Sequence, residues 1–127
     1  LLRYAEREGF NRIALGHHLD DIVETLLMNM MNKGELSGML PVLRYDKYPS
    51  VLIRPLALCE ERQIVAFAEY KGFRSAACTC PYGQTSRRLS IRKQIANLTG
   101  GSGAAKRRIF ESMSNVKPGY LSLDGTG

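Results

Sequence analysis

Two short apolar runs, Arg12–Leu15 and Val51–Ile53, alternate along this chain with longer segments whose apolar residues recur at helical spacing. The first run ends at Gly16 and the second at Arg54-Pro55, a pattern typical of short buried strands. The order helix, strand, helix, strand, helix indicates an α/β fold, because parallel strands need a helical crossover between them. Two strands cannot complete a doubly wound sheet, so either strands are missing and this is the second half of a larger parallel-sheet domain, or the chain associates.

Five helices are expected, and glycines mark the ends of most of them. The predicted ranges are 1–8, 21–33, 60–71, 87–98 and 104–116, and residues 35–50 are predicted to form a loop or an irregular hairpin. In the third helix Ile64, Phe67 and Ala68 should face inward, and in the fourth Ile91, Ile95 and Leu98. We therefore divide the chain into an α/β part (1–72), a basic part with a loop and two helices (73–117) and a flexible tail (118–127).

The charge of the chain is unevenly distributed. The formal net charge is +6, yet residues 1–43 carry four basic and six acidic side chains. In residues 71–117 the only acid is Glu111, against ten lysines and arginines. Such asymmetry favours a polyanionic partner, most commonly nucleic acid, although a solvated basic face would give the same count. The candidate phosphate contacts are Arg87, Arg88, Arg92, Lys93, Lys106, Arg107 and Arg108.

Two classes of protein are disfavoured by composition. No run approaches the roughly 20 apolar residues of a membrane span, and no signal-peptide pattern opens the chain, so we expect a cytoplasmic protein without membrane contact. The three cysteines, Cys59, Cys78 and Cys80, are an odd number without zinc-ligand spacing. A secreted disulfide framework and a self-contained zinc site are therefore not expected.

The chemistry-bearing residues gather in the segment 16–25, Gly-His-His-Leu-Asp-Asp-Ile-Val-Glu-Thr. The segment joins the end of a predicted strand to the start of a predicted helix, where open α/β sheets bind ligands. Asp20 and Asp21 can hold Mg²⁺ on nucleotide phosphates, and Gly16 lets the backbone approach a ligand closely. The alternative is structural, because Asp21 with Glu24 matches a capping box and either aspartate can cap the helix.

This segment resembles the second signature of the PP-loop ATP pyrophosphatases. Residues 53–62, Ile-Arg-Pro-Leu-Ala-Leu-Cys-Glu-Glu-Arg, and the later Cys80-Pro81-Tyr82-Gly83-Gln84 are similar to the tRNA 2-thiocytidine synthetases of that superfamily. The resemblance covers about residues 1–98 and implies a Rossmann-like domain of the adenine nucleotide alpha hydrolase type. It also implies a reaction in which ATP adenylates the C2 oxygen of a tRNA pyrimidine and a sulfur nucleophile then displaces AMP.

The resemblance further implies roles for individual residues. Asp20 would be the catalytic or Mg²⁺-associated carboxylate, Gly16 and His17 would lie near the adenosine, and Asp21 would be shared between metal and cap. The family carries a 4Fe–4S cluster on three cysteines, for which Cys80 is the expected third ligand and Cys78 the weaker candidate. The implied partners are tRNA and a sulfur donor, either a cysteine desulfurase or sulfide, and a homodimer is one assembly the resemblance leaves open.

The sequence departs from the family at two motifs. It contains neither the phosphate-binding Ser-Gly-Gly-x-Asp-Ser loop nor the N-terminal C-x-x-C pair. We therefore expect a C-terminal portion of a synthetase that is inert by itself, because pyrophosphate chemistry needs the backbone cradle of that loop. The alternatives are a relative of the tRNA-lysidine synthetases or of the 2-thiouridine synthetases, and a non-catalytic module that binds RNA or nucleotide.

Overall fold

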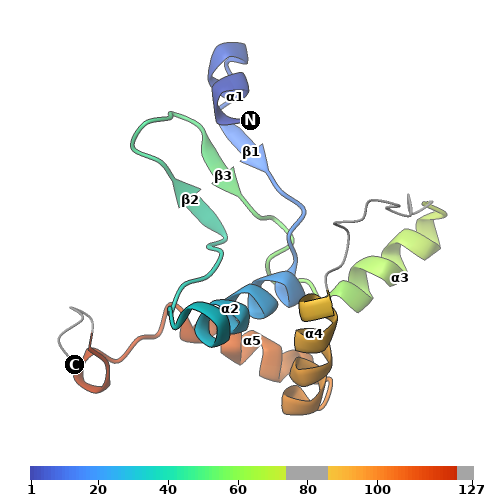
Figure 1. The fold of residues 1–127 in the computed structure, drawn as a ribbon. Helices are drawn as coiled ribbons and strands as arrows, with labels where there is room; N and C mark the ends of the chain where they lie inside the picture. The colour runs from blue at the N-terminus through green and yellow to red at the C-terminus, as the bar shows by residue number, and fades with distance from the viewer. Residues whose placement is uncertain (74–85, 123–127) are drawn as a thin grey trace.

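The computed structural model describes residues 1–73 and 86–122, with side chains in the second range from Arg88 onward. The elements, in chain order, are α1 (Leu2–Glu8), β1 (Arg12–Ala14), α2 (Leu19–Lys33), β2 (Val42–Arg44), β3 (Val51–Ile53), α3 (Glu61–Lys71), α4 (Ser86–Thr99), α5 (Gly103–Ser112) and a 3-10 turn, Pro118–Tyr120. The predicted α/β class is confirmed. Figure 1 shows a small sheet on one side and a cluster of α2, α4 and α5 on the other.

The sheet has three strands in the order β1-β3-β2. β1 and β3 run parallel, with Ile13 opposite Leu52, so both predicted strands are confirmed. β2 lies within the region expected to be a loop or an irregular hairpin, and it pairs antiparallel with β3. The sheet is therefore mixed, and the carboxyl ends of its two parallel strands meet at the end that faces the helices (Figure 1).

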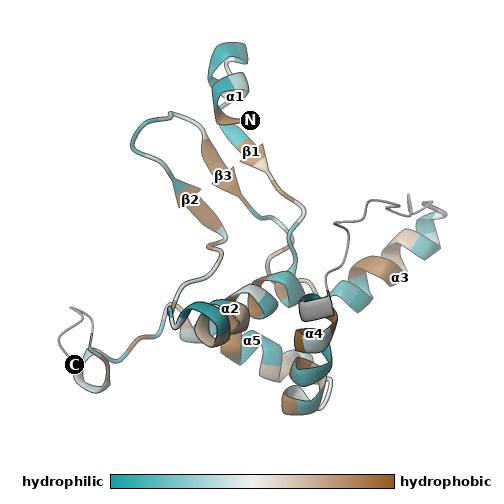
Figure 2. Ribbon diagram, in the orientation of Figure 1, coloured by the Kyte–Doolittle hydropathy of each residue, from teal (hydrophilic) through white to brown (hydrophobic). Residues whose placement is uncertain are grey.

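The main core lies between α2 and the two last helices. Leu19 and Val23 of α2 pack against Ile91 and Ile95 of α4, with Ile109 and Phe110 of α5 at the side. In Figure 2 these helices carry apolar and hydrophilic residues on the same ribbon, as amphipathic helices do. Helices on both sides of the expected boundary after residue 72 thus share one core, while the division itself stays a prediction about the chain.

Two boundary predictions need correction. Helix α2 begins at Leu19 instead of Asp21, and its N-cap is His18. Helix α5 ends at Ser112, several residues before the predicted end. The glycine predicted to end α2 is confirmed, because Gly34 has a φ of 63°, the left-handed conformation that glycine adopts without strain.

Helix α3 has no buried residue, and Figure 1 shows it extending away from the rest of the fold. Phe67, predicted to face inward, is 55% exposed. The helix carries the predicted apolar spacing, but within the described residues no element packs on that side of it. None of the described helices is both long and apolar enough to cross a membrane.

Candidate functional site

The loop after β1 and the segment after β3 come together at the carboxyl end of the parallel strands. The backbone N–H of Leu15 donates to the carbonyl of Ile53 (2.9 Å), which extends the pairing beyond β1. The N–H of Leu19, the first residue of α2, donates to the carbonyl of Cys59 (2.9 Å). The start of α2 and the start of α3 are therefore neighbours, and the residues predicted to carry chemistry lie between them.

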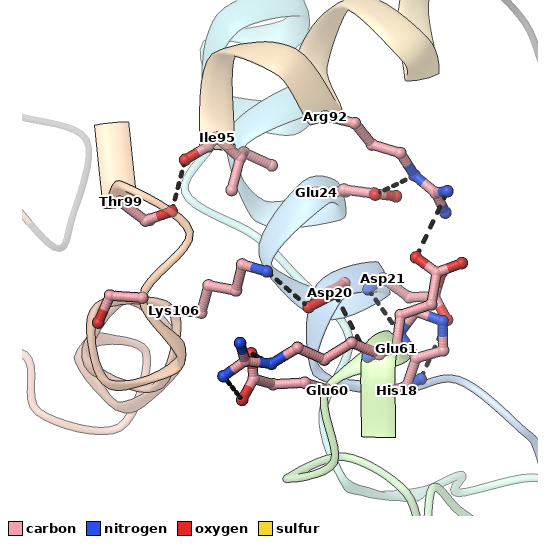
Figure 3. A network of polar contacts seen from close by, with 12 residues as sticks. His18, Asp20, Asp21, Glu24, Glu60, Glu61, Arg92, Ile95, Thr99 and Lys106 are labelled. Atoms are coloured by element: carbon pink, nitrogen blue, oxygen red, sulfur yellow. Dashed lines mark hydrogen bonds and ion pairs between the residues drawn. The ribbon is translucent and has the colours of Figure 1, made fainter. Parts of the chain in front are cut away.

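Asp20 joins three helices through its two carboxylate oxygens (Figure 3). Oδ2 accepts a hydrogen bond from the backbone N–H of Glu61 (3.4 Å), the first residue of α3. Oδ1 lies 3.3 Å from Nζ of Lys106 in α5, and both side chains are largely buried. A carboxylate at a helix N-terminus is favoured by the helix dipole. Asp20 is thus held in one orientation by α3 and by a cation from α5.

Asp21 forms the capping box of α2 with His18. Its Oδ2 accepts from the backbone N–H of His18 (3.0 Å), and its own N–H donates to Nδ1 of His18 (3.3 Å). The expected box of Asp21 with Glu24 is therefore wrong in its partners, because the helix begins two residues earlier. Of the two aspartates, Asp21 therefore has the structural role of capping the helix. The carboxylate of Asp20 is not used in the cap.

Glu24, predicted as a capping partner, is instead a buried carboxylate, only 2% exposed. Its Oε1 accepts from Nε of Arg92 (2.5 Å), and Nη1 of Arg92 lies 3.5 Å from Oε2 of Glu61 (Figure 3). Burial raises the pKa of Glu24, and the neighbouring guanidinium of Arg92 opposes that rise. The sequence does contain a signal for this position, since Glu24 lies four residues after Asp20 on the same side of the helix.

A cavity of about 160 Å³ lies among these groups, lined by Asp20, Glu24, Glu61, Arg92, Ile95, Ala96 and Lys106. A wider and more open hollow of about 420 Å³ continues from Asp20 along α3. Carboxylates and cations alternate around the smaller cavity, so its walls are close to neutral in charge. The ion pairs around the cavity connect helices to one another, and the cavity is not suited to bind an anion.

The other two residues predicted to lie near a nucleotide are at the same edge of the sheet. Gly16 is exposed, and a side chain placed there would meet nothing within 4 Å. His17 is half-buried, and its Nδ1 accepts a hydrogen bond from Nε of Arg54 (3.1 Å), the residue after β3. Arg54 belongs to the Ile-Arg-Pro-Leu stretch and was not assigned a role from the sequence.

The predicted phosphate contacts fall into two groups. Arg92 and Lys106 face carboxylates, and Nε of Arg88 lies 3.9 Å from Glu24. The exposed members are Lys93, Arg107 and Arg108, of which Arg107 donates to the carbonyl of Leu58 (3.4 Å). The side chain of Arg87 lies outside the described residues.

The residues present fit the predicted Mg²⁺ in part. Nucleotide enzymes hold Mg²⁺ through one or two carboxylates together with the phosphate oxygens of the substrate. Oδ1 of Asp20 is buried and lies 3.3 Å from Nζ of Lys106, so a Mg²⁺ there would share this carboxylate with the lysine. The described residues form no group of three metal-ligating side chains, so any ion there would need ligands from the nucleotide and from water.

The residues predicted to hold an iron–sulfur cluster cannot be tested on the described part of the fold. Cys78 and Cys80 lie outside the described residues, and Cys59 is a free thiol that faces no second described cysteine. A cluster needs several thiolates, and the described residues contain one, Cys59.

Comparisons with known proteins agree with the geometry. A family model described as a PP-loop domain matches residues 1–99. The chain is 40% identical to a tRNA-cytidine(32) 2-sulfurtransferase of Geobacter sulfurreducens and 38% identical to one of Coxiella burnetii, in each case over 95% of this chain and 48% of the relative. The chain thus spans about half the length of these curated relatives. The U34-tRNA thiolase NcsA from Methanococcus maripaludis, solved with its 4Fe–4S cluster, shares the fold with a TM-score of 0.75 at 23% identity, over 100% of this chain and 43% of that one.

Proposed function

The chain belongs to the PP-loop domain family, and on that premise we propose that it forms part of an ATP-dependent tRNA sulfurtransferase that makes 2-thiocytidine. The observation that carries the proposal is the 38–40% identity, over 95% of the chain, to relatives named tRNA-cytidine(32) 2-sulfurtransferase. The site supports it, because the carboxylate of Asp20 lies where the loops after two parallel strands converge.

The proposed reaction has two steps. The C2 oxygen of the cytosine attacks the α-phosphorus of ATP, which forms an O-adenylated base and releases pyrophosphate. A sulfur nucleophile then adds at C2, and the carbon–oxygen bond breaks with AMP as the leaving group. The adenylated oxygen leaves as AMP, which is a better leaving group than the unmodified C2 oxygen, and ATP supplies this activation.

In this scheme the residues of the chain bind and orient the reactants. Asp20 would hold Mg²⁺ on the phosphates of ATP, where the ion would neutralise charge on the oxygens. Lys106, whose Nζ lies 3.3 Å from Oδ1 of Asp20, would hold that carboxylate in place. Gly16 leaves open space at the end of β1 for the close approach of a nucleotide.

The remaining parts of the proposal concern the whole protein. Cys80, or less favourably Cys78, would be one ligand of a 4Fe–4S cluster, and the sulfur would come from a cysteine desulfurase or from sulfide. The protein would act in the cytoplasm, and a homodimer is its proposed assembly. The exposed cations Lys93, Arg107 and Arg108, with Arg87, are the proposed contacts to tRNA phosphates.

A non-catalytic module that binds RNA is the second candidate, because Lys93 and Arg108 are exposed cations that could contact phosphates without any catalytic group. The two candidates predict the same inert behaviour for the chain by itself, and different behaviour once it is joined to a phosphate-binding loop. We expect the isolated chain to release no pyrophosphate in the presence of tRNA and ATP, and to regain activity only when it is joined to a phosphate-binding loop.

A chimaeric enzyme tests the proposal. The matched half of the Geobacter sulfurreducens relative is replaced by this chain, and 2-thiocytidine in tRNA is measured by mass spectrometry. We expect the chimaera to thiolate tRNA, and Asp20→Asn to reduce thiolation by at least about 100-fold, the loss typical of removing a charged group that acts in the transition state, while tRNA binding persists. The matched control is Asp46→Asn, an exposed aspartate in the turn before β3.

Full thiolation by the Asp20→Asn chimaera would remove Asp20 from the proposed mechanism. A folded chimaera that binds tRNA and never thiolates it would favour the binding module instead.

A further inference from the structure

We propose that Arg54 is a positioning residue that turns the Nδ1 lone pair of His17 toward its guanidinium and so places the imidazole proton on Nε2, where it can donate to an acceptor atom of the bound nucleotide. Neither the motif that contains Arg54 nor the pair of histidines accounts for this contact, because the two residues are 37 positions apart in the sequence. Only the parallel pairing of β1 with β3 brings them together.

Arg54 is fixed both at its backbone and at its guanidinium. Its backbone N–H donates to the carbonyl of Pro41 (2.8 Å), and its Nη1 donates to the carbonyl of Leu40. Its Nε then donates to Nδ1 of His17 (3.1 Å). Because the guanidinium is planar and rigid, fixing Nη1 on one segment also fixes the direction of the Nε–H bond.

This contact determines where the imidazole proton lies. An arginine remains protonated and offers only donors, so Nδ1 of His17 must accept with its lone pair. A neutral imidazole has one N–H, which is then on Nε2. A proton on Nδ1 would face both the N–H of Arg54 and its positive charge. His17 is therefore presented as a hydrogen-bond donor through Nε2.

The donor is at a place where a ligand would use it. His17 is three residues before Asp20, in the loop at the carboxyl end of β1. Within the described part of the chain, Nε2 of His17 makes no hydrogen bond, and the residue is half-buried. Phosphate oxygens only accept hydrogen bonds, so a nucleotide phosphate is the class of ligand that this tautomer suits. That use rests on the proposed function, whereas the tautomer does not.

The chain contains an internal control, because His18 is its only other histidine. Nδ1 of His18 also accepts, but from the backbone N–H of Asp21 within the capping box of α2. Its tautomer is therefore set by local helix geometry and is independent of Arg54. With histidine labelled in ¹⁵N, long-range proton–nitrogen correlation spectra of the chain contain only two imidazoles.

The test compares the unsubstituted chain with Arg54→Met and Arg54→Lys. In the unsubstituted chain we expect a single Nε2–H pattern for His17. In Arg54→Met the ratio of the Nε2–H to the Nδ1–H tautomer should fall by about tenfold, as expected for loss of one charge-assisted hydrogen bond. Arg54→Lys, which keeps a cationic donor, should retain part of the preference. The pattern of His18 should be the same in all three proteins.

Three results would overturn the inference: a proton on Nδ1 of His17 in the unsubstituted chain, a mixture of both tautomers there, or an unchanged ratio in Arg54→Met. If Arg54→Met also loses the His18 pattern, the substitution has unfolded the start of α2, and the unsubstituted chain and Arg54→Lys decide the question. None of these measurements needs nucleotide or activity. A chimaera that fails to thiolate while His17 keeps its tautomer would therefore contradict the proposed function alone.

Discussion

Glu24 is held by an arginine that also contacts a carboxylate on a third helix. It lies on α2, its main partner Arg92 on α4, and the second carboxylate on Arg92, Glu61, on α3. A buried charge without a partner is costly, so the pairing of Glu24 with Arg92 also holds α2 and α4 together. An arginine held in this way has few donors left for a tRNA phosphate.

The raised pKa of Glu24 predicts a particular dependence of stability on pH. Because burial raises its pKa above the ordinary value of 4.5 in the folded state, the folded chain binds this proton more tightly than the unfolded chain. The stabilisation is complete below about pH 4.5 and is lost as the pH rises through the raised value. Relative to Glu24→Gln, the free energy of unfolding should fall as the pH rises from below 4.5 through the raised pKa of Glu24. Urea denaturation of both proteins across that range measures it.

Glu69→Gln is the matched control, since Glu69 is exposed on α3 and should give a difference that is flat with pH. The prediction would be contradicted if the free energy of unfolding of the unsubstituted chain rose with pH relative to that of Glu24→Gln.

At the scale of the element, α4 separates what periodicity predicts from what packing requires. Ile91, Ile95 and Leu98 all match a helical spacing, yet Ile91 and Ile95 are buried and Leu98 is 76% exposed. The apolar face of α4 is narrower than predicted because α2 and α5 cover only one side of its last turn. Thr99, beside Leu98, is buried instead and donates to the carbonyl of Ile95 (2.7 Å).

Alanine substitutions distinguish the two sides of α4. Ile95→Ala should lower the free energy of unfolding by about 3 kcal/mol, the cost of a cavity in a packed core. Leu98→Ala should change it by less than about 0.5 kcal/mol, because the side chain is already in water. Urea denaturation monitored by circular dichroism gives both values in one experiment. Equal losses in the two variants would mean that Leu98 is covered in solution.

Across the whole molecule, only part of the net charge of +6 is free to attract a polyanion. Several of the basic residues of the last two helices are paired with carboxylates from α2 and α3. Lys93 and Arg108 are exposed and, within the described residues, have no ion pair with a carboxylate. A polyanion could therefore contact only some of the basic residues, and the fold determines which ones are exposed.

The salt dependence of tRNA binding tests this subset. Replacing Lys93 or Arg108 with alanine should reduce the slope of log affinity against log salt by about 0.9 for each phosphate that the side chain neutralises. Lys106→Met should leave the slope unchanged, because Lys106 is already neutralised by Asp20. Fluorescence anisotropy of labelled tRNA over a series of salt concentrations measures the slopes. A slope that falls in Lys106→Met and stays constant in Lys93→Ala would reverse the assignment.

Elements that depend on local pattern could be predicted from the order of the residues alone. The two apolar runs became β1 and β3, Gly34 and Gly72 end their helices, and the family was identified from motifs that remain contiguous in the chain. These features depend on side-chain periodicity and backbone freedom, which neighbouring residues set among themselves. The start of α2 was less well predicted, because several residues before it can accept its first hydrogen bonds.

The pairing of charges, in contrast, depends on how the chain folds. Asp20 with Lys106, Glu24 with Arg92, and His17 with Arg54 are each more than 35 residues apart, and their side chains alone contain nothing that selects the partner. The pairing of β1 with β3 and the packing of α4 and α5 on α2 bring them together. Burial then makes each pairing necessary, because a charge removed from water must find a partner of opposite sign or a donor within hydrogen-bond reach.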